Sequence, residues 1–156
     1  TYGEYIFKFY NINPATDNVI FSFQVNATDD PGGDFDTSLI TSTAFAALHD
    51  EADGTAQLGY EGGHDLAQSA SFQSISRSLG NGADESCAGI LHLFSPASTT
   101  YVKHWYSRFN GYLHHDYSNN DFTAGYINDT TAIDEIRFKM SSGNISSGTI
   151  KMWGVK

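Results

Sequence analysis

The sequence predicts an all-β domain, a β-sandwich of eight to ten antiparallel strands that spans residues 1–156. Apolar and polar side chains alternate in several short segments, as they do in half-buried strands, and turn-forming residues separate these segments. Aromatic residues make up 14% of the chain, whereas Leu, Glu, Lys and Arg, which favour helices, are scarce. A jelly roll is the favoured topology, and an immunoglobulin-like sandwich is the alternative.

The clearest alternation lies near the start of the chain. Residues 5–9 place three aromatic side chains on one face, and residues 19–25 place four apolar side chains on one face. The turn-forming stretch 13–18 lies between these segments, so they are predicted to be two antiparallel strands. A third strand is expected over 39–48. Residues 49–63 are polar and rich in Gly, with Leu58 and Tyr60 as the only candidate anchors.

The middle of the chain contains one clear strand and one ambiguous segment. Residues 66–79 fit either a short helix or a strand, because Ala and Ser alternate with a few large apolar residues. Residues 88–94 form a near-continuous apolar run, interrupted by His92, that is typical of a central strand. Residues 100–109 are expected to form the next strand, followed by a long polar loop over 110–121.

Three further strands are expected at the end of the chain, over residues 122–127, 133–140 and 149–155. In the last strand, Ile150 and Met152 have one parity and Trp153 the other. If the first two face the core, Trp153 faces solvent or a neighbouring subunit. This predicts a homo-oligomer, and a trimer is the form expected for a viral jelly roll.

The charge of the chain excludes several partners. The net charge is −10 at pH 7, whereas nucleic acids and anionic membranes bind clusters of Lys and Arg. No apolar run reaches the length that crosses a bilayer, so no membrane insertion is expected. Cys87 is the single cysteine, which excludes an intrachain disulfide and a cysteine-based zinc site. Because the chain begins at Thr1 rather than Met, we expect a processed or truncated N-terminus.

Three segments carry a resemblance to a known group. They are residues 5–16 (YIFKFYNINPAT), 89–104 (GILHLFSPASTTYVKH) and 136–156, which ends in GTIKMWGVK. In these segments the chain resembles small proteins encoded among the structural genes of marine tailed bacteriophages. The resemblance implies a location on the virion surface, as a capsid decoration protein, a head fibre or a tail-fibre domain. Major capsid or tail proteins would then be its partners, and it implies no catalytic residue.

Two acidic loops are candidates for calcium binding. Asp34 and Asp36 lie in the first, and Asp50 and Asp53 lie in the second. Calcium takes six to eight oxygen ligands, which such loops can supply. Neither loop matches the EF-hand pattern, so the alternative is an ordinary solvated acidic loop. No cofactor is therefore predicted.

Enzymatic motifs are missing from the sequence. No G-x-S-x-G segment is present, and Cys87 has no recognisable catalytic surroundings. A glycosidase would need two carboxylates across a cleft, and the sequence does not single out such a pair. Neighbouring His114 and His115 point to opposite faces of a strand and could share a metal only in a bent loop. We therefore expect a protein without enzymatic activity.

The aromatic segment 101–117 is the strongest candidate for binding. Exposed aromatic rings stack on sugars and dominate protein contacts. The candidate contact residues are Tyr112, His114, His115, Tyr117 and Trp153. The alternative is that aromatic residues of this segment, Tyr101, Trp105 and Phe109, fill the core.

The sequence thus favours a non-enzymatic virion surface protein, either a capsid decoration or a head-fibre component. A tail-fibre domain that binds a receptor or host-surface glycan is the first alternative. A cellular carbohydrate-binding module is the second.

Overall fold

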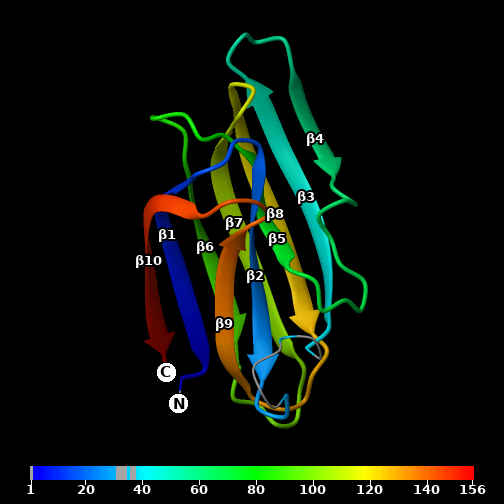
Figure 1. The fold of residues 1–156 in the computed structure, drawn as a ribbon. Coiled ribbons are helices and arrows are strands. Elements are labelled where there is room, and N and C mark those ends of the chain that lie inside the picture. Colours follow the sequence, from blue (N-terminus) through cyan, green and yellow to red (C-terminus); the bar gives the residue numbers. More distant parts are fainter. Residues whose placement is uncertain (1, 31–34, 36–37) are drawn as a thin grey trace.

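The computed structural model describes residues 2–30, 35 and 38–156, and the described residues form ten strands with no helix. Figure 1 shows their arrangement. The strands are β1 (Glu4–Pro14), β2 (Val19–Ala27), β3 (Ile40–Asp50), β4 (Ala56–Tyr60), β5 (Gln73–Leu79), β6 (Cys87–Phe94), β7 (Lys103–Leu113), β8 (Tyr117–Ile127), β9 (Ile133–Met140) and β10 (Ile145–Val155).

The strands form two layers, and every pairing is antiparallel. The large sheet has the order β10-β1-β6-β7-β8-β3-β4. The small sheet has the order β9-β2-β5 and lies in front of the middle of the large sheet in Figure 1. One pair of residues, Leu79 and Leu113, joins β5 to β7 and so connects the layers. The predicted all-β sandwich is confirmed.

The pairing along the chain is nested. Strand β1 pairs with β10, β2 with β9, and β3 with β8. Nesting of early with late strands is a feature of jelly rolls, the topology favoured by the sequence. It also brings the two ends of the described chain together, because the Gly3 amide donates to the Val155 carbonyl at 2.9 Å. Both ends therefore lie at one pole of the molecule (Figure 1).

An aromatic cluster fills the interior between β2 and β9 on one side and β1, β6 and β7 on the other. Phe9 lies at its centre, with ring centroids 5.5 Å from Phe21 and 5.0 Å from Phe109. Most of these contacts are edge-to-face, a geometry that favours aromatic pairs. Trp105 packs edge-on against Phe23 at 5.0 Å. The alternating aromatic residues of β1 and β2 therefore point inward, as predicted.

The interior between β5 and strands β3 and β8 is polar instead. Ser42 donates to the side-chain carbonyl of Gln73 at 2.6 Å, and Gln73 is fully buried. The hydroxyls of Ser107 and Thr123 lie 2.5 Å apart across β7 and β8. Buried polar groups need such partners, because an unpaired one is costly away from water. The inward residues of β3 are small there, as Ala44 and Ala46 show.

Two segments differ from the sequence prediction. Residues 110–121 form the end of β7, a tight turn and the start of β8, not a long loop. The turn is short because Asp116 adopts a positive φ of 65°, which closes a three-residue hairpin loop. The polar side chains that suggested a loop lie across the two strands from one another: Asn110 is opposite Asn120, and its side chain donates to the Ser118 hydroxyl at 3.2 Å.

The other difference concerns the proposed anchors. Leu58 and Tyr60 belong to the short edge strand β4, and they are 73% and 62% exposed. They anchor nothing, because no second layer covers β4. Tyr101 is also exposed, so the core alternative holds for Trp105 and Phe109 and is wrong for Tyr101. The ambiguous segment 66–79 is a strand from Gln73 onward.

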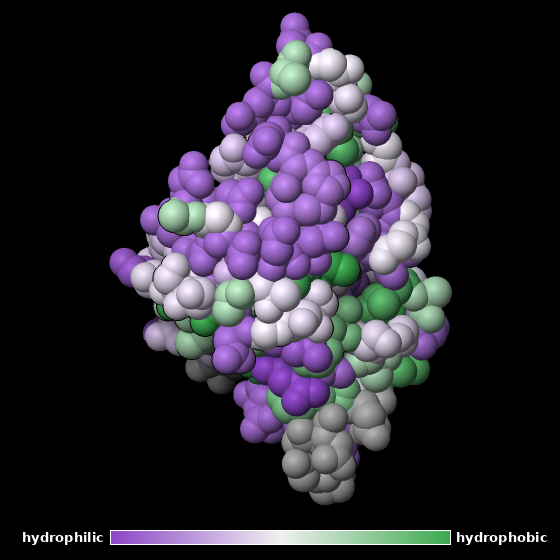
Figure 2. All heavy atoms as spheres, turned by 45° about the horizontal axis from the view of Figure 1, so that its top comes forward, coloured by the Kyte–Doolittle hydropathy of each residue, from purple (hydrophilic) through white to green (hydrophobic). Residues whose placement is uncertain are grey.

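The described residues include no helix that is long and apolar enough to cross a membrane. Hydrophilic residues cover most of the surface on the side of the small sheet, and hydrophobic residues gather toward its lower end (Figure 2).

Candidate functional site

The large sheet leaves one of its faces uncovered, and we call the outward side chains on it the outer face. Residue parity defines this face: Phe7, Trp105 and Phe109 point inward and are buried, so their strand neighbours point outward. Many outward residues are aromatic. They are Tyr10 of β1, His92 and Phe94 of β6, His104, Tyr106 and Tyr112 of β7, Phe122 and Tyr126 of β8, Phe45 and His49 of β3, Tyr60 of β4 and Trp153 of β10.

The pairing register places these rings in rows across the strands. One row runs from Trp153 through Ile6 and His92 to Tyr106. The rings of His92 and Tyr106 are stacked, with centroids 4.5 Å apart. Glu4 holds His92 in place, since its carboxylate lies 2.5 Å from the Nδ1 atom of His92. His92 therefore contacts both neighbouring strands, through Glu4 on β1 and Tyr106 on β7.

The adjacent row joins β7, β8 and β3. Phe45 and Phe122 are directly opposite one another and stack almost in parallel, with centroids 4.8 Å apart and planes at 6°. The Arg108 guanidinium lies 4.9 Å from the Phe122 centroid, within range of a cation–π contact. A hollow of about 240 Å³ lies beside these rings, and Tyr106 and Thr43 also line it. Rings fixed in this way lose little conformational freedom when a ligand stacks on them.

Charge is distributed unevenly between the outer face and the rest of the chain. Of the 18 carboxylate residues, only Glu4 points outward from the paired positions of the seven strands. Three of the eight Lys and Arg residues do so, namely Lys8, Arg108 and Lys151. Lys8 lies 5.4 Å from the Trp153 ring centroid and Lys151 lies 5.5 Å from that of Tyr10. A protein of net charge −10 therefore presents a face with a local excess of cations.

Of the predicted contact residues of segment 112–117, only Tyr112 lies on the outer face, at one end of it. Tyr112 points outward, and a hydrogen bond to Glu51 raises its pKa to about 12. His114 lies in the hairpin turn, with its Nδ1 atom 3.2 Å from the Ser78 carbonyl oxygen. The rings of His114 and His115 are close, whereas Tyr117 pairs with Leu113 where β8 begins.

Trp153 lies on the outer face, 42% exposed, at the opposite edge from β4. Ile150 and Met152 have inward parity, as predicted, yet they are 39% and 59% exposed. They do not reach the core because the small sheet ends at β9 and does not extend over β10. The outer face thus unites Tyr112 with Trp153 but not with the turn residues.

Two of the four candidate calcium ligands, Asp50 and Asp53, contact other groups of the protein. Asp50 accepts hydrogen bonds from the amides of Gly54 and Thr55 at 2.8 and 2.9 Å, which closes the turn between β3 and β4. The Oδ1 atom of Asp53 lies 3.3 Å from the Nε2 atom of His49. Asp34 and Asp36 lie outside the described residues. Across the described part of the chain, no three His, Cys, Asp or Glu side chains are placed to hold a metal ion.

A second polar cluster lies around Arg77, which bridges two carboxylates. Its guanidinium is 2.5 Å from Glu61 and 3.4 Å from Asp121. Burial raises the pKa of Asp121 to about 6, and burial also lowers the pKa of nearby His64. Asp121 is nearly fully buried, so a saccharide chain does not reach it. Burial likewise raises the pKa of the Cys87 thiol to about 12, which keeps this cysteine protonated and unreactive.

The sequence did not point to Phe45 or Phe122, and within the candidate segment 101–117 it did not single out Tyr106 or Arg108. One signal could have found the last two. In residues 103–113 every second residue is buried, so the parity opposite to Trp105 and Phe109 identifies Tyr106 and Arg108 as outward.

No protein-family model, curated protein or solved structure matches this chain.

Proposed function

We propose that the protein is a non-enzymatic virion surface protein, a capsid decoration or head-fibre component, whose outer face binds an acidic glycan of the host surface. The resemblance in the sequence supports the virion location. The uncovered row of stacked rings beside cations is the observation that supports binding. A saccharide presents C–H groups to aromatic rings, whose faces carry partial negative charge.

The composition of the face favours a glycan over a protein. Short polar side chains such as Thr41, Thr43 and Asn120 lie among the rings and can donate to or accept from sugar hydroxyls. The larger aliphatic side chains at the outward positions are few: Ile6, Ile90, Leu58 and Val155. Because the cations outnumber the single outward carboxylate, a polysaccharide that bears carboxylate or sulfate groups fits the face best.

Titration with acidic and neutral polysaccharides tests this proposal. The wild-type protein should bind a uronate-containing or sulfated polysaccharide, and the binding should weaken as salt is raised. Tyr106→Ala and Arg108→Ala should each reduce affinity about tenfold. Tyr101→Ala is the control, because Tyr101 is also exposed, at 74% against 45% for Tyr106, but lies in the loop before β7. Equal loss in the control, or no binding to either polysaccharide, would contradict the proposal.

The alternative is a tail-fibre receptor-binding domain, and copy number separates it from decoration. Quantitative mass spectrometry of purified particles would count this chain against the major capsid protein. Tens to hundreds of copies would support decoration or a head fibre, whereas a handful would support the tail. If the protein is absent from particles, the remaining alternative is a cellular carbohydrate-binding module that uses the same outer face.

A further inference from the structure

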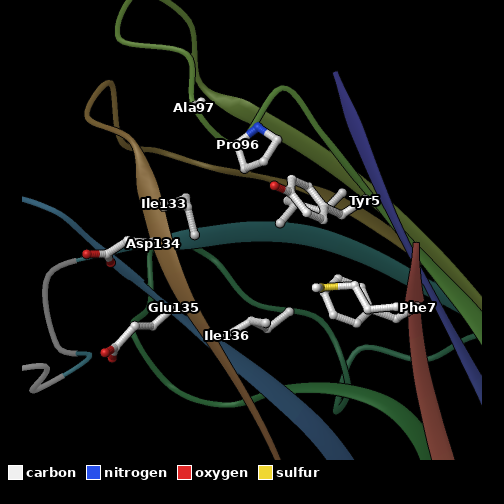
Figure 3. A pocket seen from close by; sticks show the side chains of 10 residues that line it. Tyr5, Phe7, Pro96, Ala97, Ile133, Asp134, Glu135 and Ile136 are labelled. Carbon is white, nitrogen blue, oxygen red and sulfur yellow. The ribbon is translucent and has the colours of Figure 1, made fainter. Parts of the chain in front are cut away.

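A groove runs along the side of the sandwich, between the edge strands β9 and β10. Its cavity volume is about 260 Å³. In Figure 3, Tyr5 and Phe7 lie across it from Ile133 and Ile136. Met152 and Pro96 also line it. Asp134 and Glu135 also line the groove, and in the same view their carboxylates point away from its apolar side chains.

Both strands that flank the groove have a free edge. Strand β10 pairs only with β1, and β9 pairs only with β2, within the described residues. A free edge presents unpaired backbone groups, and proteins usually protect a long one with charge, proline or a bulge. Strand β10 is eleven residues long, and its last seven residues include four exposed apolar side chains. These are Ile150, Met152, Trp153 and Val155.

The charges on β10 and on the start of β9 are opposite in sign, whereas the rest of β9 carries Arg137 and Lys139. Residues 141–156 contain no carboxylate and carry Lys151 and Lys156. Strand β9 begins with Ile133, Asp134 and Glu135, and both acidic residues are exposed. Met152 lines the same groove as Ile133 and Ile136, so the basic part of β10 is level with the acidic part of β9.

We propose that a second copy of this chain closes the groove, with β10 of each copy pairing with β9 of the other about a two-fold axis parallel to the strands. Strands β9 and β10 run in opposite directions (Figure 1). Rotation about an axis parallel to the strands preserves these directions, so each new pairing is antiparallel. The same rotation extends each large sheet into the partner's small sheet and leaves neither edge free.

Strand parity makes the charge match specific. With Ile150 opposite Ile136 of the second copy, both side chains point inward over the groove. Lys151 then lies opposite Glu135, and both point outward. The sequence led us to expect a trimer. Both free edges flank the same groove, however, so two copies are enough to pair both of them. Trp153 and Lys151 belong to both surfaces, but the test of this inference measures association of the chain and not its affinity for a polysaccharide.

Sedimentation equilibrium with charge reversal tests the dimer. The wild-type chain of 17.1 kDa should sediment as a dimer at micromolar concentration. Lys151→Glu and Glu135→Lys should each weaken association at least about tenfold, and the double variant should restore it. Glu51→Lys, the same change at the turn between β3 and β4, is the control and should have no effect.

Three results would overturn the proposal. The first is a wild-type chain that remains monomeric at about 100 μM. The second is an oligomer that neither single reversal weakens, and the third is an assembly of three copies. Restoration by the double variant also excludes misfolding as the reason for the effect of the single variants.

Discussion

The two halves of the interior contain different kinds of side chain. Between β1, β2 and β9, rings such as Phe9 and Phe21 fill the space, and their contacts do not depend on pH. Between β5, β3 and β8, hydroxyls, amides and the Arg77–Asp121 pair fill it. Apolar burial is not directional, whereas buried polar groups require specific partners. The aromatic half therefore supplies most of the stability, and the polar half makes the stability depend on pH.

Truncation at the centre of the aromatic half should have the largest effect. Phe9→Ala removes a fully buried ring and leaves a cavity, so it should lower the free energy of unfolding by about 3–5 kcal/mol. Urea denaturation followed by circular dichroism measures this. Tyr10→Ala, which removes an exposed ring from the next position, should cost less than about 1 kcal/mol. Similar losses in both variants would show that the aromatic half does not dominate.

Titration of Asp121 should have the next largest effect. The folded-state pKa of about 6 lies above the ordinary value of 3.8, so the folded state holds this proton more tightly than the unfolded state. The corresponding stabilisation is present below pH 4 and is lost as the pH rises through 6, and it amounts to at most about 3 kcal/mol.

Comparison with Asp121→Asn isolates this contribution from the other carboxylates. The difference in unfolding free energy between the variant and the wild type should shift in favour of the variant between pH 4 and pH 7. Urea denaturation at several pH values provides the measurement. A constant difference across that range would mean that Asp121 ionises in the folded state as it does in water.

The hydroxyl pair on β7 and β8 should have the smallest effect. Ser107→Ala leaves the buried Thr123 hydroxyl without its partner and should cost about 1 kcal/mol. The double variant Ser107→Ala, Thr123→Val removes both hydroxyls and should recover most of that loss, because no buried group is then unsatisfied. A double variant that loses the sum of both single effects would show that the polar half tolerates no apolar replacement.

The same contrast explains which parts of the structure could be predicted. The strands of the aromatic half were predictable because their inward residues are apolar and alternate with polar ones, as in 19–25. The start of β8 was not, because its inward residues are Asn119 and Asp121, and both contact Arg77 of another strand. The outward position of Trp153 followed from parity. The exposure of Met152 did not, because it depends on where the small sheet ends.

The closeness of the two chain ends has a mechanical consequence. Because β1 and β10 are antiparallel neighbours and their outer ends meet at Gly3 and Val155, a force applied through both ends would peel the two strands apart one hydrogen bond at a time. A force applied between these ends and the turn that contains Asp116 would instead load many hydrogen bonds at once. The molecule should therefore resist pulling along its long axis far better than pulling between its two ends.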